Sequence, residues 1–332
     1  MQTIGAIYNL LMHTHIRSFL EYCEVTKNQS EKTIENYRHY LGRFQEFLEK
    51  NKTPDLPPKK ITLKLINEYR LFLNRYETRQ TPSSTPKPLS TKTQNYHVIS
   101  LRALLKYLTK NDIETLAPEK IELPKIPERT VEVLDREELE RLFNAVDPTD
   151  VRGARDLAIL ETLYSTGLRV SELANLDRDQ IDLKRREFMV RGKGSKPRIV
   201  FLSDNAVATI TNYLKLRSDN AQPLFISFPR TSKTATPDTP ATHTTPTDIL
   251  KTNRLSTVSI QSTVNKYTRK AGIIKKVTPH TLRHTYATQL LINGADIRSV
   301  QELLGHSSIT TTQIYTHVTD KALREIHEKF HK

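Results

Sequence analysis

Apolar residues recur every three or four positions through most of the first 110 residues, which is the spacing of amphipathic α-helices. Four helices are predicted there, near Ile16–Cys23, from Ser30 to Leu48, at Leu63–Tyr76 and from Thr91 to Leu108. Thr91 and Gln94 have the spacing of a capping box, in which two side chains bond the free backbone N–H groups at a helix start. Residues 78–90 are polar, contain three prolines and are predicted to form a loop.

The pattern changes after residue 110. Residues 111–134 contain three prolines and no apolar period, which predicts an extended linker. Asp135 and Glu138 have the spacing of a second capping box and open a new helical region. Leu157–Tyr164 is almost entirely apolar, so it predicts a buried central helix, and Gly167 is its expected end. A short helix at residues 170–176 is expected next.

A β-hairpin follows in the predicted order. Its strand-like runs, Glu187–Arg191 and Arg198–Leu202, flank a turn that contains Lys193 between two glycines. A phosphate-binding loop needs Ser or Thr directly after its lysine, so this turn does not carry that motif. Residues 229–253 are rich in Thr, Pro and Ser and predict a flexible surface insertion, after which a helix is expected at Val258–Ala271.

Start and stop residues delimit short helices in the C-terminal part of the chain. Thr278 fits the N-cap position and Pro279 the first helical position, and Asn293-Gly294 ends that helix. Asp296 caps the next helix, which Gly305 ends. A terminal helix with an apolar stripe is predicted at about residues 319–330.

The chain has a net charge of +14, which indicates a polyanionic partner, with nucleic acid as the first candidate and a merely basic protein as the alternative. Basic residues on the polar faces of the N-terminal helices are the candidate DNA-backbone contacts. They are Lys32, Arg38, Arg43, Lys92, Arg102 and Lys106. For any one of them alone, a solvated helix face is the usual explanation, whereas the net charge favours DNA-backbone contact for the set.

Composition also bears on the cellular compartment. Cys23 is the only cysteine, so no disulfide framework or cysteine-based zinc site is predicted, and a reducing compartment is expected. No run reaches transmembrane length, and Ile4–Met12 lacks the features of a signal peptide. We therefore expect a cytoplasmic, nucleoid-associated protein without a membrane partner. Ile4–Met12 either extends the first helix or precedes a true start at Met12.

Several polar side chains stand at predicted helix ends and turns, with few carboxylates among them. They are Arg169, Lys193, His280, Arg283, His306 and Tyr315. These residue types suit a site that holds a phosphate and attacks it with a phenol. Structural alternatives exist: Arg169 can pair with Glu172, and Lys193 can be an exposed turn residue. His280 and His284 have a zinc-binding spacing, but no third ligand is evident, so no metal site is predicted.

With these residues in order, the chain resembles the tyrosine recombinases, particularly the Xer-type bacterial recombinases. The matching segments are 166–173 (TGLRVSEL), 192–194 (GKG), 280–284 (HTLRH), 303–306 (LLGH) and 312–317 (TQIYTH). The resemblance runs from about residue 14 to the end, although the N-terminal half is similar only in its helical pattern. The insertion at 229–253 is longer than the usual Xer loop, and the extra N-terminal residues lack a counterpart.

The resemblance implies a mainly α fold with a small antiparallel β-sheet in two domains. Their expected limits are an N-terminal extension at 1–13, a helical core-binding domain at 14–110, a linker at 111–134 and a catalytic domain at 135–332. The insertion at 229–253 and a protomer-exchange helix at about 319–330 belong to the catalytic domain.

The family's catalytic set carries over to Arg169, Lys193, His280, Arg283, His306 and the nucleophile Tyr315. The resemblance implies that Tyr315 cleaves one DNA strand, leaving a 3′-phosphotyrosine and a free 5′-hydroxyl, and that rejoining reverses this step. It implies no cofactor. The arginines suit the phosphate, and Lys193 suits protonation of the leaving 5′-oxygen. His280 and His306 are the candidate acid/base groups, and His317 is left outside the set.

The implied partners are double-stranded DNA and further copies of the chain, as a tetramer on two DNA sites joined through the C-terminal helix, with a paralogous recombinase as an alternative partner. Two rival functions stay open. One is a type IB topoisomerase, which shares the chemistry but relaxes supercoils, and the other is a non-catalytic DNA-binding protein of the same fold. The sequence leaves open the DNA target, and it leaves open both chromosome-dimer resolution and integration or excision of a mobile element.

Overall fold

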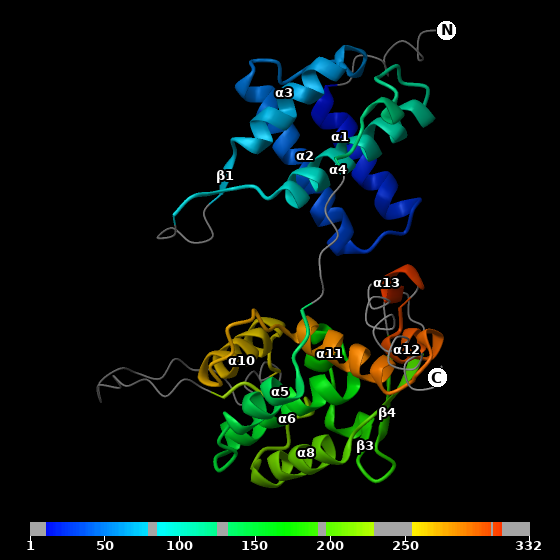
Figure 1. The fold of residues 1–332 in the computed structure, drawn as a ribbon. Coiled ribbons are helices and arrows are strands. Elements are labelled where there is room, and N and C mark those ends of the chain that lie inside the picture. Colours follow the sequence, from blue (N-terminus) through cyan, green and yellow to red (C-terminus); the bar gives the residue numbers. More distant parts are fainter. Residues whose placement is uncertain are drawn as a thin grey trace, which may run out of the picture. The chain divides into compact units, whose positions relative to one another are not determined.

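The structure is a computed structural model that describes residues 11–78, 85–124, 132–191, 197–228, 254–306 and 308–313. The chain divides into two compact units, Met1–Glu128 and Arg129–Lys332 (Figure 1). Both are mainly helical with short antiparallel strands, which confirms the predicted fold class. Among the described residues, no helix combines the length and the apolar character needed to span a bilayer.

The first unit is built from helices that pack through their apolar stripes. Its elements are α1 (Met12–Val25), α2 (Glu31–Lys50), the 3₁₀-helix η2 (Pro58–Lys60), α3 (Leu63–Asn74), β1 (Glu77–Thr78), β2 (Lys87–Pro88), α4 (Thr91–Lys110) and the 3₁₀-helix η3 (Pro118–Lys120). The third helix thus ends two residues before the predicted Tyr76. The predicted loop at 78–90 also contains a ladder, because β1 and β2 pair antiparallel, with Glu77 opposite Pro88.

The core of this unit contains the residues that the helical spacing selects. Leu41 and Phe44 of α2 join Leu101 and Leu105 of α4 in one buried cluster. Ile113 and Ile121, which lie in the segment predicted to link the domains, are buried in the same cluster. Met12 is fully buried at the start of α1, inside the predicted N-terminal extension. Apolar side chains near both predicted boundaries are therefore part of the first core.

The two predicted capping boxes have different outcomes. Asp135 accepts a bond from the Glu138 backbone N–H and Glu138 accepts one from Asp135, so this box is confirmed. The prediction of a capping box at Thr91 and Gln94 is wrong. Ser90 is the N-cap and accepts from Thr93 N, while Gln94 Nε2 donates to the Leu89 carbonyl. A serine one position earlier supplies a hydroxyl that satisfies the helix start, which shifts the cap by one residue.

The second unit packs helices around α6 and carries a three-stranded sheet at one side (Figure 1). Its elements are α5 (Arg136–Asn144), α6 (Val151–Thr166), α7 (Val170–Ala174), the 3₁₀-helix η4 (Arg178–Gln180), β3 (Ile181–Asp182), β4 (Glu187–Arg191), β5 (Pro197–Phe201), α8 (Asp204–Leu216), α10 (Thr257–Lys270), α11 (Pro279–Ile292), α12 (Ile297–Leu304) and α13 (Thr310–Gln313). The predicted hairpin is confirmed, since β4 and β5 pair antiparallel with Met189 opposite Ile199. The sheet order is β3-β4-β5.

Helix α6 is the central helix that the apolar run predicts. Ile159, Leu160 and Leu163 are completely buried. Gly167 ends the helix with φ 59°, a left-handed conformation that glycine adopts without strain. Helix α7 ends at Ala174, two residues sooner than predicted. The hairpin turn at 192–196, the predicted insertion at 229–253 and the predicted terminal helix at 319–330 lie outside the described residues.

Candidate active site

The C-terminal ends of α6 and α12 form the base of the candidate site. Gly167 ends α6 and Gly305 ends α12, both in the left-handed conformation. Neither position has room for a side chain, because a Cβ on Gly167 would lie 2.5 Å from Tyr286 Cδ1 and one on Gly305 would lie 2.9 Å from Arg198 Cδ. The last carbonyl groups of a helix have no partner inside the helix. Here they turn toward arginine side chains.

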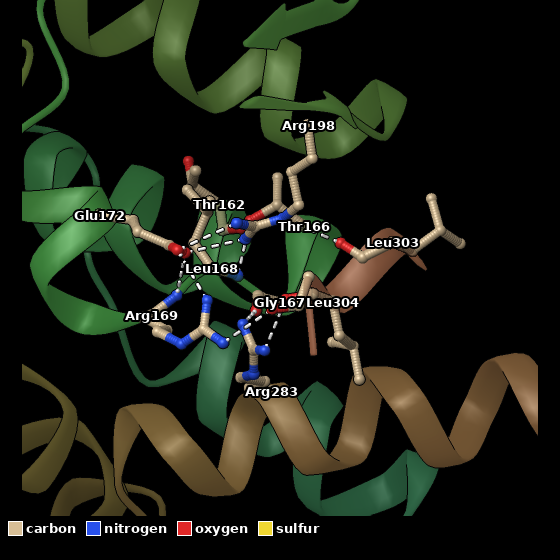
Figure 2. Close-up of polar contacts among 11 residues, drawn as sticks. Thr162, Thr166, Gly167, Leu168, Arg169, Glu172, Arg198, Arg283, Leu303 and Leu304 are labelled. Carbon is tan, nitrogen blue, oxygen red and sulfur yellow. Dashed lines mark hydrogen bonds and ion pairs between the residues drawn. The ribbon is translucent and has the colours of Figure 1, made fainter. Parts of the chain in front are cut away.

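Three arginines from separate elements bond these carbonyl groups (Figure 2). Arg283 of α11 donates through Nη1 to the Gly167 oxygen, at 2.6 Å, and through Nη2 to the Leu304 oxygen, at 2.7 Å. Arg169, the residue before α7, donates through Nη2 to the Gly305 oxygen at 3.0 Å. Arg198 of β5 donates through Nε to the Leu303 oxygen at 3.1 Å. Three consecutive carbonyls at the end of α12 are thus each held by a different arginine, and we call Arg169, Arg198 and Arg283 the arginine cluster.

Glu172 supplies the acidic partner of this cluster. Arg198 Nη1 and Nη2 bond its two oxygens at 2.9 and 2.8 Å, and Arg169 Nη1 bonds Oε1 at 2.9 Å. Burial acts to raise the pKa of Glu172, but the bonds from Arg198 and Arg169 outweigh it and lower the pKa to about 2. The carboxylate is therefore ionised at neutral pH. The cluster has three guanidinium charges and Glu172 offsets one of them, which leaves an excess of positive charge that favours an anion such as a phosphate.

Two histidines stand beside the cluster. His280 occupies the second position of α11, directly after Pro279, and His306 follows Gly305. Burial, together with the charges of Arg283 and Arg169, lowers the pKa of His280, and the same influences lower the pKa of His306 to about 4. His306 Nδ1 lies 3.0 Å from the hydroxyl of the buried Thr312. Both imidazoles are therefore neutral at pH 7 and able to accept a proton.

The structure brings together four of the six sequence-predicted catalytic residues. Arg169, His280, Arg283 and His306 come from three helix ends, and the charges of the two arginines act on both histidines. Lys193 and Tyr315 lie outside the described residues. In the sequence, Lys193 stands in the turn between β4 and β5, and Tyr315 follows α13 by two residues.

Sequence reasoning did not single out Arg198. The signal that could have found it is strand alternation. Arg198 lies two residues before the buried Val200 and so on the same, inward-facing side of the strand, whereas Ile199 and Phe201 are exposed on the other side. An arginine in an inward-facing strand position requires an internal partner, because an unpaired buried charge is costly. The ion pair between Arg169 and Glu172, considered as an alternative to a phosphate contact, is present at 2.9 Å. It coexists with the bond to Gly305.

The six candidate DNA contacts of the first unit differ in their surroundings. Arg43 is largely buried and lies 3.8 Å from the centre of the Tyr76 ring, and Arg102 Nε donates to the Pro118 oxygen at 3.1 Å. Lys32 pairs with Glu35 at 2.6 Å. The remaining three, Arg38, Lys92 and Lys106, have exposed side chains. Arg43 and Arg102 therefore hold the fold together, whatever else they contact.

Across the part of the chain that the structure describes, no three His, Cys, Asp or Glu side chains are placed to hold a metal ion. His280 and His284 both lie on α11, and the charge of His284 is one of those that lower the pKa of His306.

Comparison with known families gives two matches that together span most of the chain. Residues 132–322 match the phage integrase family, and residues 14–121 match the phage integrase SAM-like domain. The two matches correspond to the two compact units of the structure.

Curated relatives match over nearly their whole length. Tyrosine recombinase XerD of Staphylococcus epidermidis (strain RP62A) is 35% identical over 96% of this chain and 99% of its own. Tyrosine recombinase XerC of Anoxybacillus flavithermus is 35% identical over 94% of this chain and 96% of its own.

Solved structures share the fold. The XerH site-specific recombinase bound to palindromic difH substrate, in a post-cleavage complex, gives a TM-score of 0.67 at 22% identity, covering 96% of this chain and 85% of that one. The Tn1549 transposon integrase in complex with transposon right end DNA gives 0.68 at 19% identity, covering 96% of this chain and 99% of that one.

Proposed function

This chain belongs to the phage integrase family and is a site-specific DNA recombinase of the Xer type, and from this we propose that it cleaves and rejoins DNA through a covalent bond to Tyr315. The observation that carries the proposal is the arginine cluster beside two neutral histidines. Double-stranded DNA is the proposed substrate, since the XerH and Tn1549 integrase structures hold DNA.

In the proposed reaction the Tyr315 oxygen attacks the phosphorus of one DNA strand. A phenol has a pKa near 10, so the attack at neutral pH requires a base to take its proton. His280 and His306 are the candidate bases, because their lowered pKa values leave the imidazoles unprotonated and the negative charge of a bound phosphate strengthens them as bases. The bond from phosphorus to the 5′-oxygen breaks, and Lys193 gives that oxygen a proton. The products are a 3′-phosphotyrosine and a 5′-hydroxyl.

Rejoining is the same reaction in reverse. The 5′-hydroxyl attacks the phosphotyrosine, and the Tyr315 oxygen leaves and regains its proton. The phosphotyrosine bond keeps the energy of the original phosphodiester, so this chemistry needs no nucleotide to drive ligation. Exchange of 5′-hydroxyls between two DNA sites before rejoining would produce recombinant strands.

The arginine cluster is proposed to stabilise the phosphorane transition state. Arg169 and Arg283 supply the planar, permanently charged groups that bind non-bridging phosphate oxygens. A guanidinium has five N–H donors, and Arg169 uses one for Glu172 and one for Gly305, so further donors remain for phosphate. Because bonds to backbone carbonyls already fix both arginines, little reorganisation is required when charge develops on the phosphate oxygens.

The exposed face of α4 is the proposed DNA contact of the first unit. Lys92, Tyr96, Ile99 and Lys106 are all exposed and follow one another at intervals of four, three and seven residues, which places them on one side of the helix. Tyr40 of α2 stacks on Tyr96 with ring centres 6.1 Å apart. The face thus combines positive charge for phosphates with exposed apolar groups that suit base edges in the major groove.

Lys92→Ala and Lys106→Ala are each expected to weaken DNA binding about equally for all sequences. Each should lower the slope of log affinity against log salt by about one, because each lysine displaces about one counterion. The measurement is a salt titration of DNA affinity by fluorescence anisotropy. Arg43→Met serves as the control and should lower the thermal unfolding midpoint without changing the slope. Unchanged slopes for both lysine variants would contradict the proposed face.

Assembly and biological role are further parts of the proposal. We propose a tetramer on two DNA sites, with the predicted helix at 319–330 exchanged between copies, and a role in chromosome-dimer resolution or mobile-element movement. The helix falls outside the described residues, so this part is supported by its apolar sequence stripe alone.

Covalent capture tests the proposed function. The protein is incubated with fragmented DNA of its host, the mixture is denatured, and DNA attached to protein is sequenced. One short recurrent sequence is expected. A supercoiled plasmid with two copies of that sequence should then yield recombinant products. Relaxation of a plasmid that lacks the sequence, without recombinants, would instead indicate a topoisomerase.

A further inference from the structure

Arg198 occupies a central position in the site that neither the motifs nor the proposed chemistry explain. It lies on β5, five residues after Lys193, and pairs across the hairpin with Val190. Its side chain points inward and is only 9% exposed. A charged side chain buried to this degree needs several partners to offset its lost hydration.

Those partners belong to two other elements (Figure 2). Two guanidinium nitrogens bond both oxygens of Glu172 on α7, and the third bonds the Leu303 oxygen at the end of α12. The chain at Gly305 packs so closely on the Arg198 stem that only glycine fits there. One side chain therefore connects the hairpin, the helix that follows Arg169 and the turn that precedes His306.

We propose that Arg198 is a positioning residue for strand cleavage, an inference that rests on the proposed function. It acts on Arg169 through Glu172 and on His306 through the end of α12. Arg198 itself is not assigned a contact with DNA.

The first action is electrostatic and geometric. With Arg198 in place, the Glu172 carboxylate is shared between two arginines, and both of its oxygens are directed. Without Arg198, the full negative charge would act on Arg169 alone and the carboxylate would be free to rotate. Arg169 would then be drawn toward Glu172 and would offer less positive charge to the phosphate.

The second action concerns the end of α12. The carbonyl oxygens of Leu303, Leu304 and Gly305 each accept one hydrogen bond from the arginine cluster, and His306 is the next residue. Loss of the Arg198 bond would remove one of the three attachments of this segment. A displacement of about 1 Å in a catalytic group can cost about 10²-fold in rate.

Lysine at this position keeps the charge but cannot reproduce the contacts. A single ammonium cannot bond both carboxylate oxygens and a carbonyl on the opposite side with the geometry of a planar fork. Arg198→Lys therefore keeps the positive charge at this position and removes the contacts that hold Glu172 and the end of α12. We expect its rate of covalent adduct formation to fall by about 10²-fold on saturating DNA, whereas its DNA affinity should change by no more than about twofold.

Arg217→Lys is a matched control. Arg217 is also buried, bonds Asp219 through two nitrogens and donates to the carbonyls of Pro223 and Leu224, but its contacts include no catalytic residue. Thermal unfolding measures the stability cost of both variants. If Arg198 acts only through stability, the two variants should lose adduct formation in proportion to the same loss of folded protein. A loss specific to Arg198→Lys at equal folded fraction supports the proposal.

A double variant at Arg198 and Arg169 tests whether Arg198 acts through Arg169. If Arg198 works through Arg169, the double variant Arg169→Lys/Arg198→Lys should form the adduct within about twofold of the rate of Arg169→Lys alone, because residues that act as a unit are non-additive. Independent effects that multiply would overturn the action through Glu172 and Arg169. Absence of an adduct from the unaltered protein would refute the proposed function instead.

A neutral pair covers the case in which Arg198→Lys does not fold. Arg198→Gln with Glu172→Gln removes the buried charges together, a change that proteins often tolerate. This variant loses the directed carboxylate at Arg169 and the attachment of the α12 end, so it should bind DNA and form the adduct as slowly as Arg169→Lys. An adduct rate equal to that of the unaltered protein would overturn the positioning role.

Discussion

Tyr315→Phe is expected to form no covalent adduct with DNA at all, while it binds DNA as tightly as the unaltered protein. Phenylalanine keeps the aromatic ring and deletes only the oxygen that we propose as the nucleophile. The measurement uses end-labelled DNA that contains the captured site. A denaturing gel reports the adduct, and a native gel reports binding.

The control for this prediction is a tyrosine close to the arginine cluster. Tyr286 lies on α11, and burial raises the pKa of its hydroxyl although Arg198 and Arg283 act in the opposite direction. A phenol that is harder to ionise is a poor nucleophile, so Tyr286→Phe should still form the adduct. If Tyr315→Phe forms the adduct and Tyr286→Phe does not, the nucleophile has been assigned to the wrong residue.

Much of the fold follows from local rules that the sequence displays. Gly167 and Gly305 end their helices in the left-handed conformation, and Thr278 caps α11, as their residue types predict. The apolar run of α6 is buried, and the hairpin forms where the strand-like runs indicate. Each of these features depends on a few neighbouring residues, so it can be predicted without knowledge of the tertiary structure.

Features that depend on tertiary contacts could not be predicted in this way. Arg43 looks like a free cation on a polar helix face, yet its guanidinium packs on Tyr76, which is distant in sequence. Arg198 looks like an ordinary basic residue of a hairpin, yet its partners lie 26 and 105 residues away. Local spacing carries no information about which residue comes close through folding. The sequence motifs predict the residues of the candidate site, and the structure adds how Arg169 and Arg283 are held.

Backbone carbonyls at helix ends orient the arginines of the site. Helix ends supply the carbonyl acceptors that fix the three arginines, so the same backbone groups that a helix leaves unpaired set the geometry of the site. Only Glu172 contributes a full negative charge to the bonds described for the cluster. Neutral carbonyls can therefore orient the arginines without cancelling the positive charge that a phosphate needs.

Lys193→Ala is expected to cleave ordinary DNA slower by a factor on the order of 10²–10⁴, the contribution of a general acid. An alkoxide leaves poorly at neutral pH, so the departing 5′-oxygen requires a proton as its bond to phosphorus breaks. We propose that Lys193 donates that proton, because in the sequence the lysine stands between β4 and β5, and β5 carries Arg198 into the site. The measurement is the single-turnover rate of adduct formation.

A DNA substrate with sulfur in place of the bridging 5′-oxygen distinguishes proton donation by Lys193 from stabilisation of charge on the phosphate. A thiol has a pKa of only about 8.5, so a thiolate departs without a proton donor. Lys193→Ala should therefore regain most of its cleavage rate on the sulfur substrate. Arg169→Ala, which removes a transition-state contact worth about 10²–10³-fold, should remain slow on both substrates, since sulfur does not replace the lost bond to the phosphate. Equal rescue of both variants, or rescue of neither, would show that Lys193 is not the acid, and His280 or His306 would then be the proton donor to test.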